Sequence, residues 1–260
     1  MKNRCFSARL VALLLTSVAL LGSCKKTPDS PPAVGTVSFA IDNMAGAKDV
    51  ALDGTAYTTA SGETFTVSTL RYYISNIKLL KSNGGSYAAP NSYFLIDADK
   101  PSSARFTLGN VPVGDYTGAS FLIGVDSTAT KADPLQLTGD LNPANNMYWV
   151  WSTGHIFMKL EGTVTSTTPN KALICHVGGY RAPYSASVTA TPSFNGTTLQ
   201  VRADHTPQLH YSADILKIFD GPTKFTLSNF PTTMMPSAAS VQVATNYAAG
   251  MFTVKNIQAN

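Results

Sequence analysis

The sequence predicts an all-β fold, an antiparallel β-sandwich or barrel-like single domain with one short helix near the C-terminus. Short stretches of alternating apolar and polar residues, rich in β-branched and aromatic side chains, recur between Gly, Pro and Asn turn signals. Charged residues make up only 13% of the 260 residues, and 19 Gly and 15 Pro accompany them, which is unlike a helical bundle or a charged disordered chain. The length is sufficient for one large core.

The predicted elements follow from these patterns in order along the chain. The first strand is expected at residues 36–41, and a second at residues 64–80, where the apolar rhythm slips near residues 75–76 and indicates a bulge. The Asn-Gly-Gly sequence at 83–85 predicts a hairpin turn, because glycine adopts positive φ without steric cost. Further strands are expected at residues 93–96, 104–108, 115–123, 156–164, 172–177, 185–190, 197–201 and 208–212, with a short helical turn at 143–147 and a helix at 238–248.

The N-terminal segment, residues 1–23, has the parts of a bacterial lipoprotein signal peptide. A basic start precedes an apolar stretch too short to span a bilayer, and the segment ends in Leu-Gly-Ser before Cys24. This ending resembles the lipobox, in which cleavage leaves Cys24 as an acylated N-terminus; the alternative is an ordinary secretory signal that happens to hold a cysteine. Residues 24–35 are Pro-rich and polar, which predicts a semi-extended lipidated tether to a β domain at residues 36–260.

The expected location is therefore a membrane surface facing the periplasm or the cell exterior. Cys5 leaves with the leader and Cys24 carries lipid, so the mature chain keeps only Cys175 and has no intrachain disulfide, zinc ribbon or CxxC redox motif. Three basic residues of the leader account for most of the formal charge of +4, so the mature chain is near neutral. Binding to nucleic acid through bulk charge is not expected.

The familiar catalytic motifs are absent from the sequence. There is no Gly-rich phosphate loop between a strand and a helix, no GxSxG elbow, no HExxH helix and no D-x-D-x-D-G calcium loop. A Ser-His-Asp site assembled in space is compatible with the composition, but nothing local favours one. The motifs alone therefore favour no class of enzyme.

Residues 142–157 form the densest unusual segment and contain both tryptophans, Trp149 and Trp151. In a strand, residues two apart point to one face, so the two indoles would form an aromatic wall beside Tyr148 or His155. Spacing alone favours a pair packed in the core, since such rings bury large areas. A carbohydrate platform of exposed aromatic rings is the second structural alternative.

The histidines are the other candidate functional residues: His155, His176, His205 and His210. A single histidine is usually structural or exposed, but His176 precedes Gly178, where backbone can approach closely, and His210 lies in an alternating stretch. Imidazole suits zinc, copper, iron and nickel, whereas soft sulfur ligands favour Cu(I). The available sulfurs are those of Met44, Met147, Met158, Met234 and Met235, although methionine more often fills gaps in a core. Spacing alone fixes no metal.

The run Met-Tyr-Trp-Val-Trp-Ser-Thr-Gly at 147–154, followed by Ile-Phe-Met-Lys-Leu-Glu-Gly at 156–162, resembles the W-x-W signature of MbnP-like proteins. Other segments resemble the family in the same order. Residues 65–77 are similar to its strand with the sequence YylSni, and residues 111–118 are similar to its VPaGxYtg turn. Residues 123–126, 141–143 and 176–179 also fit, so the resemblance covers roughly residues 36–255.

MbnP-like proteins are copper-binding partners found beside methanobactin genes, so the resemblance implies an extracytoplasmic β-protein that binds one copper ion as Cu(I). It implies that Trp149, the first tryptophan of the motif, is oxidised to kynurenine by a dihaem partner of the MauG and cytochrome c peroxidase type. The aromatic amine and carbonyl of kynurenine are potential ligands. The histidine of the family's H-x-G segment is His176 here, with His155 or His210 as a possible further ligand and with Trp151 and Met147 as neighbours.

Two positions depart from the family pattern. Asn43 stands where many relatives have a histidine, and His155 stands where relatives carry a tyrosine. His155 could supply the imidazole missing at position 43, or it could replace a packed tyrosine by a solvent-facing histidine. The alternative function is a glycan- or protein-binding structural lipoprotein without a metal. The metal hypothesis weakens if Trp149 is buried in the core and His176 lies beyond a side chain's reach of every other histidine or methionine sulfur. It is abandoned if Trp149 and His176 lie on opposite sides of the sandwich.

Overall fold

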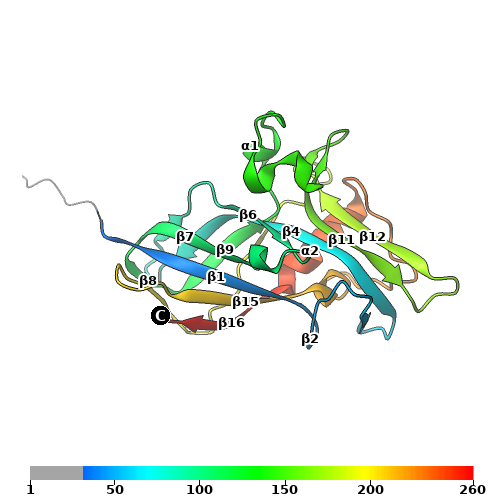
Figure 1. The fold of residues 1–260 in the computed structure, drawn as a ribbon, viewed down its shortest axis with the longest axis horizontal. Coiled ribbons are helices and arrows are strands. Elements are labelled where there is room, and N and C mark those ends of the chain that lie inside the picture. The colour runs from blue at the N-terminus through cyan, green and yellow to red at the C-terminus, as the bar shows by residue number, and fades with distance from the viewer. Residues whose placement is uncertain (1–31, 260) are drawn as a thin grey trace, which may run out of the picture. The chain divides into compact units, whose positions relative to one another are not determined.

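The computed structural model describes residues 32–259 (Figure 1). These residues form two larger β-sheets and a two-stranded ribbon. The five-stranded sheet has the order β16(Phe252–Gln258), β15(Gln208–Asp214), β1(Val34–Ala45), β2(Lys48–Asp49), with β7(Arg105–Pro112) also paired to β1. The nine-stranded sheet has the order β10(Tyr148–Trp149), β11(Gly154–Val164), β4(Thr64–Leu80), β9(Gly118–Ile123), β13(Val188–Ala190). In that sheet β12(Lys171–Gly178) pairs with β11, while β3(Ala56–Thr58), β5(Ser86–Ala88) and β6(Tyr93–Asp97) pair with β4; β8(Gly114–Tyr116) and β14(Leu199–Val201) form the ribbon.

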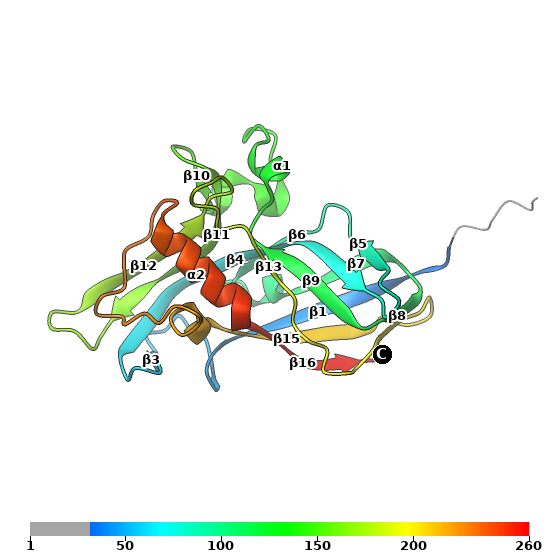
Figure 2. The ribbon, with the colours of Figure 1, turned by 180° about the vertical axis from the view of Figure 1, so that it is seen from behind.

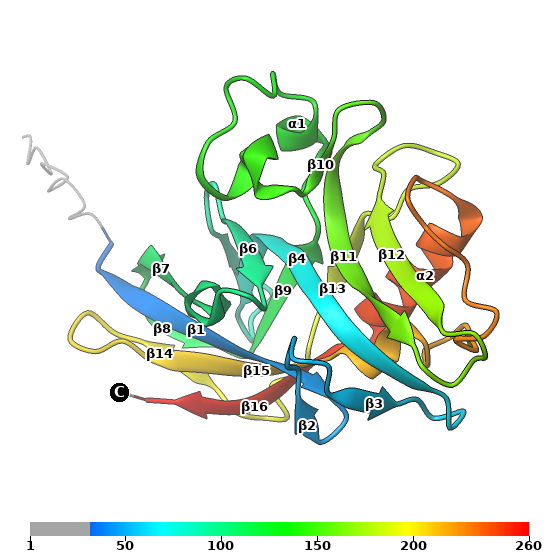
Figure 3. The same ribbon diagram turned by 45° about the vertical axis from the view of Figure 1, so that its right-hand side comes forward.

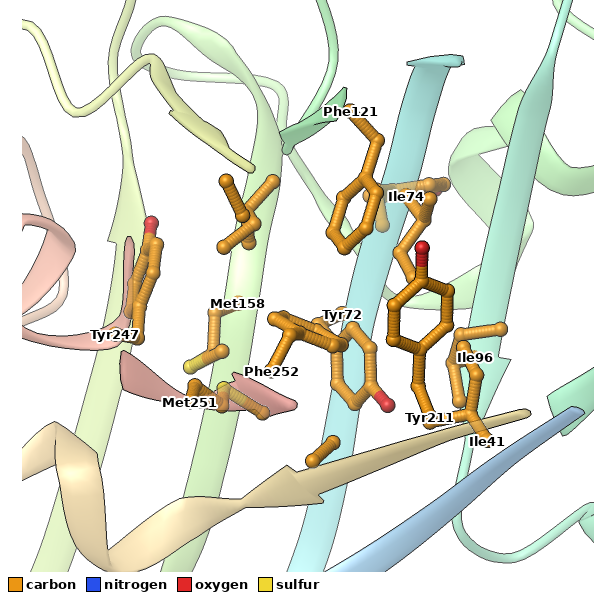
Figure 4. Packing of buried hydrophobic residues seen from close by; sticks show 14 of the residues in the cluster. Ile41, Tyr72, Ile74, Ile96, Phe121, Met158, Tyr211, Tyr247, Met251 and Phe252 are labelled. Carbon is orange, nitrogen blue, oxygen red and sulfur yellow. The ribbon is translucent and has the colours of Figure 1, made fainter. Parts of the chain in front are cut away.

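The core lies between the inner faces of the two larger sheets (Figure 4). Tyr72 of β4 packs edge-on against Phe252 of β16, with ring centroids 5.8 Å apart. Phe121 of β9 contacts the same Phe252 at 5.0 Å and Tyr211 of β15 at 5.7 Å. Edge-to-face pairs of this kind add about 0.5–1.5 kcal/mol to the burial of each ring. The predicted all-β sandwich is confirmed.

One strand pair runs parallel. β1 pairs with β15 in parallel from Ser38 opposite Gln208 to Met44 opposite Asp214, whereas the other named pairs in the described residues are antiparallel. Strand direction is set by long-range packing, so periodicity along the chain carries no signal for it.

β4 is the longest strand and matches residues 64–80 as predicted. Its register with β9 shifts between Ser75 and Lys78, and Asn76 adopts a φ of 52°, so the predicted bulge is confirmed. The predicted hairpin turn is confirmed as well. Gly84 has a φ of 83°, and the Lys81 N–H donates to the Gly85 carbonyl at 2.8 Å before β5 pairs back onto β4.

Several predicted strands differ from the observed ones. The strand expected at 115–123 is two elements, because the chain leaves β8 at Tyr116 and enters a different sheet at Gly118. The strand expected at 104–108 begins at Arg105 and runs to Pro112, after a 3-10 helix η1(Pro101–Ala104). The strand expected at 185–190 shortens to β13. Strands β2, β3, β5, β10 and β16 were not predicted; four of them have only two or three residues, too few to show a period.

The expected C-terminal helix is confirmed as α2(Ala238–Gly250), which packs against β12 and β13 (Figure 2). It begins with a capping box, in which Ser237 and Ser240 satisfy each other's backbone N–H groups. The other α-helix within the described residues is the single turn α1(Ser127–Thr130), capped by Asp126. Three further 3-10 helices are η2(Gly139–Leu141), η3(Pro143–Asn145) and η4(Ile215–Ile218), of which η3 confirms the short turn predicted at 143–147.

β1 begins at Val34, so the last two residues of the expected tether already belong to the β domain. The signal peptide expected at 1–23, the acylated Cys24 and the tether up to residue 31 lie outside the described residues. Within residues 32–259, no helix has the length and apolar character needed to cross a bilayer.

Candidate functional site

A recess of about 430 Å³ lies beside β10, β11 and β12, three strands that Figure 3 shows next to one another. Its walls bring together residues from distant parts of the chain: Tyr148, Trp149, Trp151, Lys159, His176 and Met234. Two residues singled out in the sequence for a metal site, Trp149 and His176, therefore line one recess.

Trp149 reaches the recess because β10 and β11 form a tight hairpin, in which Trp149 pairs with Gly154 and Tyr148 with His155. The strand ends at Trp149, and Trp151 lies in the turn, so the continuous strand that would place both indoles on one face does not form. The rings are nevertheless close, with centroids 5.8 Å apart and planes inclined by 40°. Trp149 is 5% exposed and Trp151 is 59% exposed, so the first indole is packed in the core and the second lies on the surface.

Gly178 explains how the indole approaches β12. A Cβ atom at this position would lie 2.8 Å from Cζ3 of Trp149 and 2.8 Å from the carbonyl oxygen of His155. Only glycine leaves room for the ring there. Residues two apart in a strand share a face, so the ring lies on the face of β12 that also carries His176.

His176 is 7% exposed and is held by a carboxylate. Its Nε2 lies 2.7 Å from Oε1 of Glu161, whose other oxygen accepts a hydrogen bond from the Thr69 hydroxyl at 3.0 Å. Lys159, opposite His176 in the register, places its ammonium 3.5 Å from the same Glu161 oxygen. Because an ionised carboxylate only accepts, His176 Nε2 carries the proton and Nδ1 keeps a free lone pair.

The charge states follow from burial and from these partners. Burial lowers the pKa of His176 below its ordinary value and outweighs the opposing hydrogen bond to Glu161, so the imidazole is neutral near pH 7. Burial opposes ionisation of Glu161, but the hydrogen bonds from His176 and Thr69 and the charge of Lys159 together hold the pKa of Glu161 below its usual range. A neutral imidazole with an oriented free nitrogen is the form that binds a metal.

Met234 joins the recess through backbone pairing of the loop before α2. The His176 N–H donates to the Thr233 carbonyl at 2.7 Å, and the Thr233 N–H donates to the Ile174 carbonyl at 3.1 Å. These bonds attach the loop to β12, and the half-exposed Met234 that follows Thr233 lines the same recess as His176. Met147, expected as a neighbour of the site, is buried in the core and does not itself line the recess, and Met158 is buried there as well.

The other candidate histidines lie elsewhere. His155 is buried between the rings of Tyr73 and Tyr148, with Nε2 3.1 Å from the Leu141 carbonyl, and it does not line the recess. It therefore occupies a packed position of the kind a tyrosine would fill. Burial lowers the pKa of His155.

His210 lies on β15, in the sheet opposite to that of His176, and its Nε2 is 3.0 Å from Oδ2 of Asp42. Asn43, which stands where many relatives have histidine, lies on β1 and accepts a hydrogen bond from the Tyr72 hydroxyl at 2.7 Å. The structure brings neither residue to the recess. Among the described residues, no group of three or more His, Cys, Asp or Glu side chains is arranged to hold a metal ion.

Sequence reasoning missed Glu161, Lys159 and the selection of Met234 among the methionines. Lys159 and Glu161 are charged residues two apart within an apolar strand, and that pattern was the available signal for a polar face there. No local signal places Met234 in the same recess as His176, because that placement depends on the pairing of residues 174–176 with residue 233.

A larger hollow of about 590 Å³ lies over β9 and β13, and half of its lining residues carry hydroxyl groups. Its carboxylate, Asp126, already accepts hydrogen bonds from Tyr93, Asn76 and two backbone N–H groups of α1. No histidine or methionine lines it. The recess is therefore the better candidate for chemistry at a metal.

Comparison with known proteins agrees with the sequence pattern. A family model described as MbnP matches residues 34–236. A solved structure titled MbnP from Methylosinus trichosporium is similar to this chain with 15% sequence identity and a TM-score of 0.47, and the alignment covers 87% of this chain and 99% of that one. No curated protein sequence matches significantly.

Proposed function

The chain belongs to the MbnP family, and from that premise we propose that it is a lipid-anchored extracytoplasmic protein that binds one copper ion as Cu(I) in copper homeostasis. In this proposal copper is the cargo and the protein is not an enzyme. The observation that carries the proposal is the shared recess, which Trp149 and His176 both line.

Two of the side chains that line the recess, those of His176 and Met234, suit a soft, monovalent metal ion, although the cationic side chains of Arg71 and Lys159 line it as well. His176 offers Nδ1, because Glu161 engages Nε2, and Met234 offers a thioether. Imidazole and thioether are ligands that Cu(I) accepts, and Cu(I) is satisfied by few of them. The carboxylate behind the imidazole orients the ring and raises its basicity, as outer partners of metal-bound histidines do.

Oxidation of Trp149 to kynurenine would add a further donor group in the same recess. The indole loses four electrons and four protons and takes up the oxygen atoms of two water molecules, which gives N-formylkynurenine. Hydrolysis then releases formate and leaves kynurenine, whose aromatic amine is a potential ligand. A dihaem partner of the MauG and cytochrome c peroxidase type would accept the electrons and pass them to hydrogen peroxide, two molecules of which become four of water.

The anchor and location rest on the sequence. Residues 1–23 and Cys24 have the lipoprotein pattern, and several acyl chains on one cysteine hold a protein firmly at a membrane, since each buried CH₂ contributes about 0.8 kcal/mol. Replacing Cys24 by alanine should release the protein from the membrane fraction. Retention of Cys24→Ala on membranes would contradict the anchor.

The alternative function, a glycan- or protein-binding structural lipoprotein without a metal, is favoured by one observation. Trp151 lines the recess and is 59% exposed, as an aromatic platform requires. The two functions differ in what the buried His176 contributes, since a platform formed by Trp151 does not need its imidazole.

Copper titration against a chromophoric Cu(I) chelator discriminates between the functions. The protein is produced with a dihaem partner of the stated type, and the residue at 149 is identified by mass spectrometry. We expect one tightly bound Cu(I), lost in His176→Gln and kept in the matched variant His210→Gln, whose imidazole lies in the other sheet. An unmodified Trp149 without tight copper binding, or equal affinity in both variants, would contradict the proposal.

A further inference from the structure

The two tryptophans of the chain differ sharply in accessibility although they are neighbours. Trp149 is 5% exposed, while Trp151 is 59% exposed and lies at the surface turn of the same hairpin. Their ring centroids are 5.8 Å apart. Of the two rings, an external oxidant therefore contacts mainly Trp151, and the residue proposed for oxidation is its immediate aromatic neighbour.

We propose that Trp151 is an electron relay between an external oxidant and Trp149. The inference rests on the proposed function, in which a haem partner oxidises Trp149, and it adds the route that the electrons take. A haem is enclosed by its own protein, so its edge cannot enter a recess whose indole is nearly covered. The exposed ring of Trp151 is the group that such a partner can contact.

The relay balances for each electron. Trp151 gives one electron to the oxidised haem of the partner and becomes a radical cation. Trp149 then gives one electron to Trp151, which returns to its starting state, so the net transfer is one electron from Trp149 to the haem. Four such transfers supply the oxidation to N-formylkynurenine described above, and Trp151 is left chemically unchanged.

The surroundings of the pair support transfer between these two rings. The Trp149 ring lies against the backbone at Gly178, so β12 covers it on that side. Val150 and Met235 are exposed apolar residues and are the sequence neighbours of Trp151 and Met234, which line the recess. The other residues of the turn, Val150, Ser152 and Thr153, carry no aromatic ring that could act as the relay in place of Trp151.

The test uses a photochemical oxidant, so that it does not depend on copper binding or on the partner. The full chain is illuminated with tris(bipyridine)ruthenium and persulfate at low dose, and oxidation at each position is mapped by peptide fragmentation. The variants are Trp151→Phe, which keeps an aromatic ring that is hard to oxidise, and Trp151→Tyr, which keeps an oxidisable one. Trp149→Phe identifies products formed at position 151 alone, and circular dichroism verifies the fold of each variant.

We expect oxidation at Trp149 in the wild type, loss of most of it in Trp151→Phe, and recovery in Trp151→Tyr. A role of Trp151 limited to shape would give the same result for both variants. Oxidation at Trp149 that is undiminished in Trp151→Phe, or absent in the wild type, would overturn the relay. Absence of copper binding in the titration above would overturn the proposed function and leave this result standing, so the two failures are distinguishable.

Discussion

The close approach of Trp149 to Gly178 gives the most quantitative test of how the recess is built. In Gly178→Ala, the new methyl group would lie 2.8 Å from both the Trp149 ring and the His155 carbonyl oxygen. One of these neighbours is backbone, so the indole must move. Overpacking of this kind costs about 1–3 kcal/mol. For a domain of this size each kcal/mol lowers Tm by about 2–4 °C, so we expect a decrease of roughly 2–12 °C.

The matched control is Gly109→Ala in β7, where no atom lies within 4 Å of the added carbon. We expect its unfolding free energy to stay within about 0.5 kcal/mol of the wild type. Calorimetry gives Tm for both variants, and intrinsic fluorescence reports the displaced indole, because both tryptophans of the chain lie at the recess. A Gly178→Ala protein with the Tm and the emission spectrum of the control would refute the packing described here.

Three further outcomes follow from the contacts. Glu161→Gln should weaken Cu(I) binding by about 10–100-fold in the chelator titration, since it loosens the orientation of His176, with the fold retained by circular dichroism. Burial lowers the pKa of His155 below its ordinary 6.5, so as the pH decreases the unfolded state binds the proton before the folded state does. In denaturation series at decreasing pH, the free energy of unfolding of the wild type should decrease once the pH is below about 6.5, and that of His155→Phe should decrease less. Burial opposes ionisation of Glu63, but two backbone N–H groups outweigh it and lower its pKa below the ordinary 4.5. The contribution of ionised Glu63 to the free energy of unfolding should be complete above about pH 4.5 and should be lost as the pH falls through the lower pKa of the folded state. Glu63→Gln should lower the free energy of unfolding by about 1 kcal/mol near neutral pH, a modest effect because solvent screens this carboxylate. A flat pH profile for the wild type, or a copper affinity unchanged in Glu161→Gln, would contradict the respective assignment.

The local elements were largely predictable because their signals are local. The alternation of β4, its slip near Asn76 and the glycine turn that follows it depend on side-chain pattern and on positive φ. The break between β8 and β9 was not predictable, because residues 115–123 alternate without interruption while Tyr116 pairs with Leu199 in another sheet. The parallel pairing of β1 with β15 likewise joins segments far apart in sequence.

Two principal residues of the candidate site were predictable from the sequence, but the loop that completes the recess was not. Trp149 and His176 follow from the family resemblance, and the glycine two residues after His176 signalled a close approach that the indole fills. Met234 arrives through a loop paired to β12, which no local pattern encodes. The tertiary fold decides which face of its strand His155 occupies and in which sheet His210 lies, so neither position could be predicted from the local sequence.

Anomalous diffraction at the copper edge, from crystals of the Cu(I)-loaded protein, tests the central claim most directly. The account predicts one copper peak inside the recess, between residue 149 and the Nδ1 atom of His176, with the Met234 sulfur within bonding reach. A copper peak beside His210 or His155, or a loaded crystal without a peak in the recess, would contradict it.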